Sequence, residues 1–160
     1  MYLNSLFYRI KGIINLIKLE EIQMKKNIFL LIITSLTLMS SEVRLIKDSK
    51  YKLIWEDNKH VEKERINHIE AIKYCNNLKF GTFKWRMPTL NELLTIVDYK
   101  RYKPATLKEF EHVNRDRLYW STTPYARSSN EYWGVNFKDG STSNASQRYN
   151  RYVRCVADLK

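Results

Sequence analysis

The chain has 160 residues, 44% of them hydrophobic and 13% aromatic, which favours one folded domain with a short targeting segment and excludes a largely disordered chain. Its formal net charge is +11, and residues 42–160 contain 23 basic and 15 acidic residues, a net of +8. A positive excess favours acidic partners such as anionic polysaccharide or phospholipid headgroups, although scattered basic residues also serve solubility.

The N-terminal region has the pattern of an export signal. A basic lead beginning at Met24 precedes an apolar run over 28–39, and small residues follow it. The run is shorter than the about 20 apolar residues that a membrane span needs, so the pattern is typical of a secretory signal. We expect 24–41 to be a signal peptide, 1–23 to be an extension upstream of the true start, and 42–160 to be the mature domain. The alternative is an uncleaved membrane anchor.

The first predicted elements of the mature chain are a strand and a helix. Side chains alternate over 51–55, which indicates a strand, and 56–59 is predicted to be a polar turn. Asn67, with Glu70 three residues later, predicts the N-terminus of a helix over 68–79.

The stretch 85–94 combines a tryptophan, a proline and a capped helix. Thr89 and Glu92 have the spacing of a capping box, and Pro88 fixes the direction in which the chain enters the helix. Apolar residues then recur at three- and four-residue spacing, which predicts a helix over 90–98.

The second half of the mature chain is predicted to be a loop followed by strands. Residues 99–117 have no clean period, so we expect a surface loop with one turn near 107–110. Asp-Gly at 139–140 is a good hairpin signal. A polar loop is expected over 124–130. Strands are expected over 119–122, 132–137 and 152–156.

Cys75 lies in the first predicted helix and Cys155 in the last predicted strand. An even number of cysteines in an exported chain indicates a disulfide, and the absence of a Cys-x-x-Cys pair argues against redox chemistry. The bond closes a loop of about 80 residues and is expected to stabilise the fold by about 4 kcal/mol. It also places the first helix against the last strand.

Several segments spread over about 50–157 follow one pattern: Leu53-Ile54-Trp55, Glu70 to Leu78, Trp85-Arg86-Met87-Pro88-Thr89, Tyr119-Trp120-Ser121, Trp133 to Phe137, and Tyr152-Val153-Arg154-Cys155-Val156. Together they resemble the Lcl C-terminal domain, a bacterial family of largely unknown function. The resemblance implies an α+β, C-type-lectin-like fold that is also similar to formylglycine-generating enzymes. Two helices would flank a small twisted antiparallel sheet, with the N- and C-terminal strands adjacent. His68 departs from the family, in which a tryptophan is common there.

The sequence contains no set of residues that indicates catalysis or a metal. The three histidines share no ligand spacing with each other or with the cysteines, and no pair of carboxylates suits acid–base chemistry. Both cysteines belong to the predicted disulfide, which argues against formylglycine-generating activity. The Glu-Pro-Asn and Trp-Asn-Asp motifs of calcium-dependent lectins do not occur. We expect no catalytic residue, no metal and no cofactor.

Structural roles are expected for a set of residues in the most specific segments. Trp120, Trp133 and Phe137 are expected to fill the sheet core. Arg86 and Arg154 are either anion ligands or partners of buried acids and backbone carbonyls, and we favour the second interpretation. The full set is Trp85, Arg86, Pro88, Thr89, Glu92, Trp120, Trp133 and Arg154.

The predicted interaction surface is the loop-rich half from Trp120 to Arg151. Aromatic faces suit sugar rings, arginine forks suit sulfate, carboxylate or phosphate, and asparagine adds hydrogen bonds. The exposed ligand-binding candidates are Tyr125, Arg127, Asn144, Arg148, Tyr149 and Arg151.

These patterns predict a periplasmic or secreted, non-catalytic binding or adhesion domain. The expected partner is an acidic or sulfated polysaccharide or an envelope protein. No nucleic-acid partner is expected. Contact with a membrane is expected only through an uncleaved signal peptide. One alternative is a protein-interaction module of the envelope. The other is an enzyme that modifies protein or cell-wall material, and a cleft that contains a group with a shifted pKa would indicate such an enzyme.

Overall fold

The computed structural model describes residue 12, residues 16–30 and residues 43–159. Contacts divide the chain into two compact units, 1–41 and 42–160. Residues 16–30 of the first unit are helical. The predicted cleavage site after residue 41 and most of the apolar run lie outside the described residues. None of the described helices combines the length and the apolar character that crossing a membrane requires.

One small sheet joins the two ends of the second unit. β1 (Leu45–Asp48), β2 (Leu53–Glu56) and β6 (Val156–Asp158) are antiparallel in the order β1-β2-β6. The predicted adjacency of the N- and C-terminal strands is therefore confirmed. The sequence did not predict β1, and β6 begins at Val156 rather than at residue 152. β2 begins at Leu53 because the two residues before it form a turn, in which Lys52 has a φ of 54°.

Three short helices, α2 (Lys59–Lys63), α3 (His68–Asn77) and α4 (Leu90–Thr95), each begin at a side-chain cap. Both side-chain bonds of a capping box are present at the starts of α3 and α4, which confirms the two predicted helix starts. α2 was not predicted, because its capping residue lies in the expected polar turn. The second unit therefore has three described helices where two were predicted. Both predicted helices end earlier than expected, α3 at Asn77 and α4 at Thr95.

The second sheet is a three-stranded meander of β3 (Leu118–Tyr125), β4 (Ser128–Asn136) and β5 (Ser141–Ser146). The predicted loop over 124–130 is wrong, because only residues 126–127 form a turn and the rest is strand. The predicted hairpin at 139–140 is confirmed, with a φ of 79° at Gly140. Gly134 allows β3 and β4 to approach, since a Cβ there would lie 2.2 Å from the Tyr119 carbonyl oxygen.

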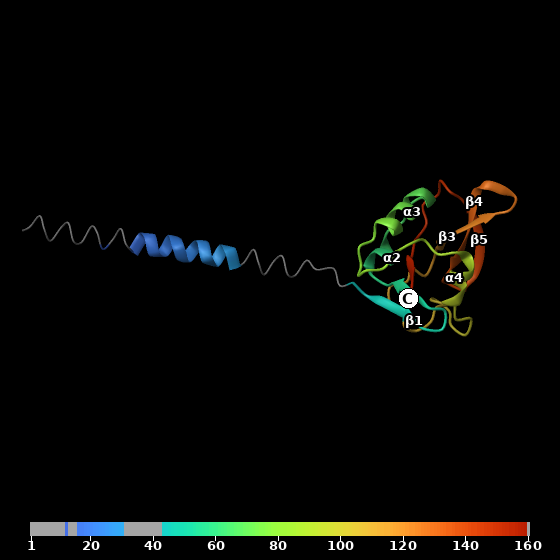
Figure 1. Ribbon diagram of the computed structural model, residues 1–160, viewed down its shortest axis with the longest axis horizontal. Helices are drawn as coiled ribbons and strands as arrows, with labels where there is room; N and C mark the ends of the chain where they lie inside the picture. Colours follow the sequence, from blue (N-terminus) through green and yellow to red (C-terminus); the bar gives the residue numbers. More distant parts are fainter. Residues whose placement is uncertain (1–11, 13–15, 31–42, 160) are drawn as a thin grey trace, which may run out of the picture. The chain divides into compact units, whose positions relative to one another are not determined.

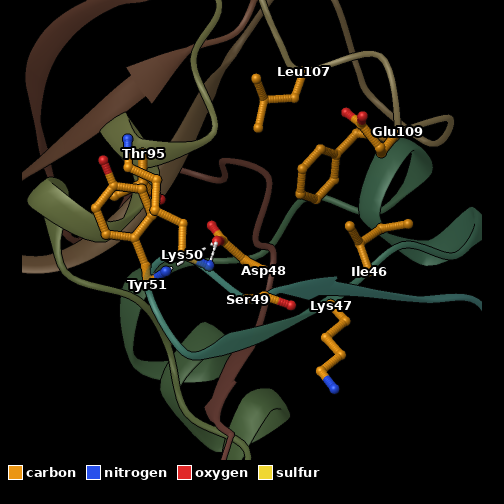
Figure 2. A pocket seen from close by; sticks show the side chains of 10 residues that line it. Ile46, Lys47, Asp48, Ser49, Lys50, Tyr51, Thr95, Leu107 and Glu109 are labelled. Atoms are coloured by element: carbon orange, nitrogen blue, oxygen red, sulfur yellow. Dashed lines mark hydrogen bonds between the residues drawn. The ribbon is translucent and has the colours of Figure 1, made fainter.

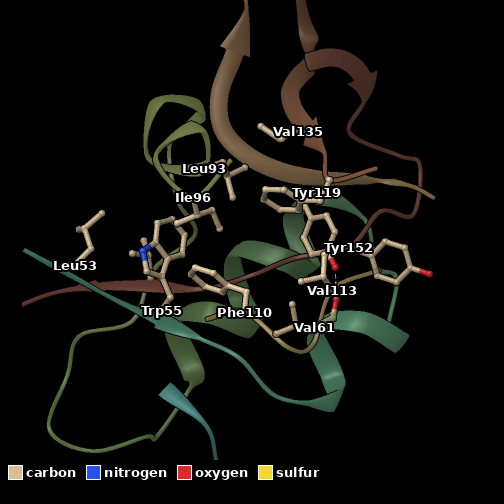
Figure 3. Close-up of a cluster of buried hydrophobic side chains, with 12 residues drawn as sticks. Leu53, Trp55, Val61, Leu93, Ile96, Phe110, Val113, Tyr119, Val135 and Tyr152 are labelled. Carbon is tan, nitrogen blue, oxygen red and sulfur yellow. Dashed lines mark hydrogen bonds between the residues drawn. The ribbon is translucent and has the colours of Figure 1, made fainter. Parts of the chain in front are cut away.

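Figure 1 shows α2 and α3 on one side of the second unit and β3, β4 and β5 on the other, with α4 beside this sheet. Two core clusters lie between these elements. In the first, drawn in Figure 3, Leu93 of α4 and Ile96, which follows α4, pack with Trp55 of β2 and Tyr119 of β3. The second cluster includes Trp85, Trp120 and both cysteines. β2 contributes to both clusters because successive strand side chains point to opposite faces.

The predicted disulfide is confirmed. Cys75 of α3 and Cys155, which directly precedes β6, are bonded, and their Cα atoms are 5.4 Å apart. Both residues are fully buried. Residues 42–160 thus hold both core clusters, the disulfide and both sheets in one compact α+β unit, so we expect this unit to fold without residues 1–41.

Candidate functional site

The side chain of Arg154 lies inside the domain and not on its surface. It is fully buried, and Nη1 donates to the Glu56 carbonyl at 2.6 Å and to Asp57 Oδ1 at 2.9 Å. Nη2 donates to the His112 carbonyl at 2.6 Å, and the guanidinium lies 4.7 Å from the centre of the Phe110 ring. Arg154 therefore has the structural position that we favoured from the sequence, with no face open to a ligand.

Asp57 is the buried acid at the centre of this network. Its carboxylate also accepts the backbone amides of Glu111 and His112, and it contacts Arg44. Burial alone would raise the pKa of Asp57, but Arg154 and the two amides outweigh burial and lower it. Residues 56–58 of the expected polar turn thus form a buried polar junction that fixes three distant segments.

Arg86 also has a structural role. Its guanidinium forms a two-bond fork with the Glu92 carboxylate, at 2.9 and 2.7 Å, and donates to Asp158 at 2.8 Å. Glu92 in turn accepts the Thr89 amide at the start of α4. Arg86 therefore connects the α4 cap to β6, and its charge is matched by two carboxylates.

His68 is buried at the start of α3. Its ring stacks on Tyr132, with centroids 3.5 Å apart, and meets Trp120 edge-on. Nε2 lies 2.9 Å from the Ser121 carbonyl oxygen and donates to it. Burial lowers the pKa of His68, although the Ser121 carbonyl opposes this shift. His68 is thus an imidazole packed against two aromatic rings, and its burial favours the neutral form.

This lowered pKa predicts a loss of stability in mild acid. Because the unfolded chain takes up the proton at a normal pKa of about 6.5, the stabilisation is complete above that pH and declines as the pH falls. We expect the free energy of unfolding, measured by urea titration, to decrease between pH 7 and 5. His68→Phe should reduce this slope. Equal slopes in the wild type and His68→Phe would contradict the assignment.

Tyr125, Arg127 and Asn144, three of the six ligand candidates, lie on or beside the meander. Tyr125 meets Trp133 edge-on, with ring centroids 5.3 Å apart. The Asn144 amide donates to Glu131 of the neighbouring strand, and Arg127 is exposed in the turn between β3 and β4. Trp120 and Phe137 are fully buried as expected, but Trp133 is only partly buried and belongs to neither core cluster.

Arg148, Tyr149 and Arg151, the other three candidates, lie in the segment that follows β5. The Arg151 guanidinium carbon is 5.3 Å from the centre of the exposed Tyr149 ring. Arg151 also exchanges two backbone hydrogen bonds of 3.0 Å with Ile66, so its position is fixed by the main chain.

The fold brings Arg65 and Arg117 to the same place. Arg65 precedes Ile66, and Arg117 precedes Leu118, whose carbonyl accepts the amide of the residue after Arg151 at 3.1 Å. Burial lowers the pKa of Arg151, and so do the charges of Arg117 and Arg65. In the part of the chain that the structure describes, none of these three arginines forms a salt bridge. We call Arg65, Arg117, Tyr149 and Arg151 the arginine surface.

Charge is concentrated around the arginine surface. Its three segments, 63–65, 115–117 and 148–151, hold six basic and two acidic residues, a net of +4. These ten residues therefore carry half of the +8 of residues 42–160. A shallow cavity of about 280 Å³ lies beside them, lined by Glu62, Lys63, Val113, Asn114, Arg115 and Asp116.

The family model for the Lcl C-terminal domain matches residues 44–157. The chain belongs to this family. The resemblance that the sequence motifs indicated is thereby confirmed, and the match spans all six strands of the Lcl C-terminal domain except the end of β6. No curated protein matches the chain.

The Lcl C-terminal domain also has a larger cavity, of about 470 Å³, drawn in Figure 2. Ile46 of β1 lies on one side of the cavity, and Tyr51 and Thr95 lie across from it; Phe110 also lines the cavity. Asp48 accepts the backbone amides of Lys50 and Tyr51 within the β1–β2 turn, so its carboxylate shapes the turn. No group of three or more potential metal ligands occurs among the described residues.

Sequence reasoning found only part of the arginine surface. Arg151 and Tyr149 were candidates, but Arg65 and Arg117 were not, because three separate segments supply the set. Two features of the sequence could have indicated the missing residues. No acidic residue lies close to Arg151 in the sequence, and Arg65 and Arg117 lie just before a predicted helix and a predicted strand.

Proposed function

We propose that this protein is an exported, non-catalytic binding domain whose arginine surface holds an acidic or sulfated polysaccharide. The observation that carries the proposal is the convergence of Arg65, Arg117 and Arg151 without an acidic partner in the described chain. Like charges placed together lower stability unless something else is gained. An anionic ligand that bridges the guanidinium groups supplies that gain.

The chemistry of the arginine surface fits this ligand class. Guanidinium groups present planar forks that match carboxylate and sulfate oxygens, and the exposed Tyr149 ring adds a flat face on which a sugar can rest. By contrast, Arg86 is paired with Glu92, and Arg154 is paired with Asp57. The surface is open rather than enclosed, which suits a polymer that extends beyond the site.

Two features support a periplasmic or secreted location. The signal-like pattern over 24–41 precedes the domain, and the structure has a disulfide with no free cysteine among the described residues. Disulfides persist in oxidising compartments, and a fully buried one contributes to the stability of the fold. A C-type-lectin-like arrangement remains our expectation for the fold.

Retention on immobilised sulfated polysaccharide tests the proposal. The oxidised 42–160 domain should be retained at low ionic strength and released by salt, because exposed charges are screened within about 10 Å at 0.1 M. Arg117→Gln with Arg151→Gln should weaken binding by about tenfold or more, since each charge-assisted hydrogen bond contributes about 1.5–3 kcal/mol.

Lys100→Gln with Arg101→Gln removes the same charge elsewhere and is the matched control. It should change retention by much less than the arginine pair does. No retention of the wild type at low salt would refute the proposal. Retention of the unmodified domain on an envelope protein alone would favour the protein-interaction alternative.

A further inference from the structure

The loop after α4 displays two tyrosines in an unusual way. Tyr99 and Tyr102 are 72% and 64% exposed, the highest values for large hydrophobic residues within 43–159. Lys100, Arg101 and Lys103 lie between and beside them and are exposed as well. This stretch, expected from the sequence to be an irregular surface loop, thus alternates aromatic and basic side chains at the tip.

The base of this loop is held by a ladder of backbone hydrogen bonds. The Asp98 amide donates to the Ala105 carbonyl at 3.2 Å, and the Ala105 amide donates to Phe137 at 2.7 Å. The Lys103 amide donates to Lys138 at 2.8 Å. The Tyr99 ring also rests against Gly140, where a Cβ would lie 2.8 Å from the ring. The tyrosines are therefore held outside the core by a fixed frame.

The β1–β2 turn adds to the same end of the domain. Tyr51, which is 46% exposed, and Thr95 at the end of α4 lie on the same side of the larger cavity (Figure 2). Leu107, whose amide donates to the Ile96 carbonyl at the base of the loop, lines the same cavity. The Lys50 ammonium is 4.8 Å from the Tyr51 ring centre. We call residues 47–52 and 98–103, with Leu107, the tyrosine surface.

The tyrosine surface carries the rest of the excess charge. Its two segments hold six basic and two acidic residues, a net of +4. Both acids are used locally, since Asp48 and Asp98 each accept backbone amides within their own turns. Together with the arginine surface this accounts for the whole +8 of residues 42–160, so the remaining part of the domain is neutral.

We infer that the tyrosine surface rests on the headgroup region of an anionic lipid bilayer. Tyrosine rings are enriched at this depth of a membrane, because the ring is apolar and the hydroxyl stays hydrated. Lysine and arginine near the surface are attracted by anionic lipids. At one end of the domain, three exposed tyrosines and a leucine each lie beside a basic residue. This combination fits a bilayer, which has an apolar interior and an anionic surface, better than it fits a polysaccharide, which is hydrated throughout. The sequence led us to expect membrane contact only through an uncleaved signal, and this inference goes beyond that expectation.

Co-sedimentation of the oxidised 42–160 domain with vesicles tests the inference. The domain should bind vesicles of phosphatidylcholine mixed with phosphatidylglycerol and should bind pure phosphatidylcholine vesicles much more weakly. Lys100→Gln with Arg101→Gln should lower the partition coefficient by about tenfold or more. Tyr99→Ser with Tyr102→Ser should lower it severalfold, and both side-chain pairs are exposed, so circular dichroism should show an unchanged fold.

Arg117→Gln with Arg151→Gln is the matched control and should keep vesicle binding. Conversely, Tyr99→Ser with Tyr102→Ser should leave retention on sulfated polysaccharide unchanged. The lipid-binding inference and the proposed function can therefore be refuted independently of each other. The inference is overturned if the wild type does not bind anionic vesicles, if it binds neutral ones equally, or if the arginine pair loses as much binding as the loop pairs.

Discussion

Asp57→Asn is expected to lower the free energy of unfolding by about 3–5 kcal/mol, because it leaves the fully buried Arg154 charge uncompensated. The same change weakens the acceptors for the amides of Glu111 and His112. Since the folded-state pKa of Asp57 is lowered, its stabilisation is complete above the unfolded value of about 3.9 and is lost as the pH falls further. Urea unfolding at several pH values measures both effects.

Asp116→Asn is the control for this prediction. Asp116 is exposed and forms no salt bridge among the described residues, so the change should stay within about 0.5 kcal/mol of the wild type. If Asp57→Asn were equally mild, the buried junction would not be what fixes these segments.

Removal of the disulfide should have an effect of similar size. Cys75→Ala with Cys155→Ala opens a loop of 80 residues, and loop entropy predicts a loss of about 4 kcal/mol. The urea midpoint of the double variant should fall accordingly. The wild type unfolded in the presence of reductant should show the same midpoint as the variant. An unchanged midpoint in the double variant would mean that the packing of α3 against the last segment suffices without the bond.

Local signals in the sequence predicted local structure well. Asn67 with Glu70, and Thr89 with Glu92, satisfy helix amides only a few residues away, so their spacing is visible in the sequence. The Asp-Gly hairpin is equally local. The disulfide was also predictable, because the chain contains only two cysteines.

Long-range structure explains the errors. Residues 56–58 are polar, yet they are buried, and Arg154 reaches Asp57 from 97 residues away. β3 continues through Pro124 because irregular pairing with β4 tolerates a residue without an amide. α4 ends early because Val97 and Asp98 pair with Thr106 and Ala105 instead of continuing the helix. None of these partners is adjacent in the sequence.

The candidate site shows the same division. The exposure of Arg148 and Tyr149, just before the last predicted strand, could be anticipated, whereas Arg151 is half-buried. The role of Arg65 depends on the pairing of Ile66 with Arg151, and that of Arg117 on the pairing of Tyr119 with Tyr152. The six predicted ligand residues also separate into two groups. Among the described residues, the group after β5 is the one that lies beside further arginines without a salt bridge.

Chemical-shift mapping of the 42–160 domain with a short sulfated oligosaccharide tests the central proposal most directly. The account predicts that the largest perturbations, saturable and weakened by salt, occur at the arginine surface, with Arg65, Arg117 and Arg151 shifting together. Perturbations confined to residues 98–103, or the absence of any saturable change at low salt, would contradict it.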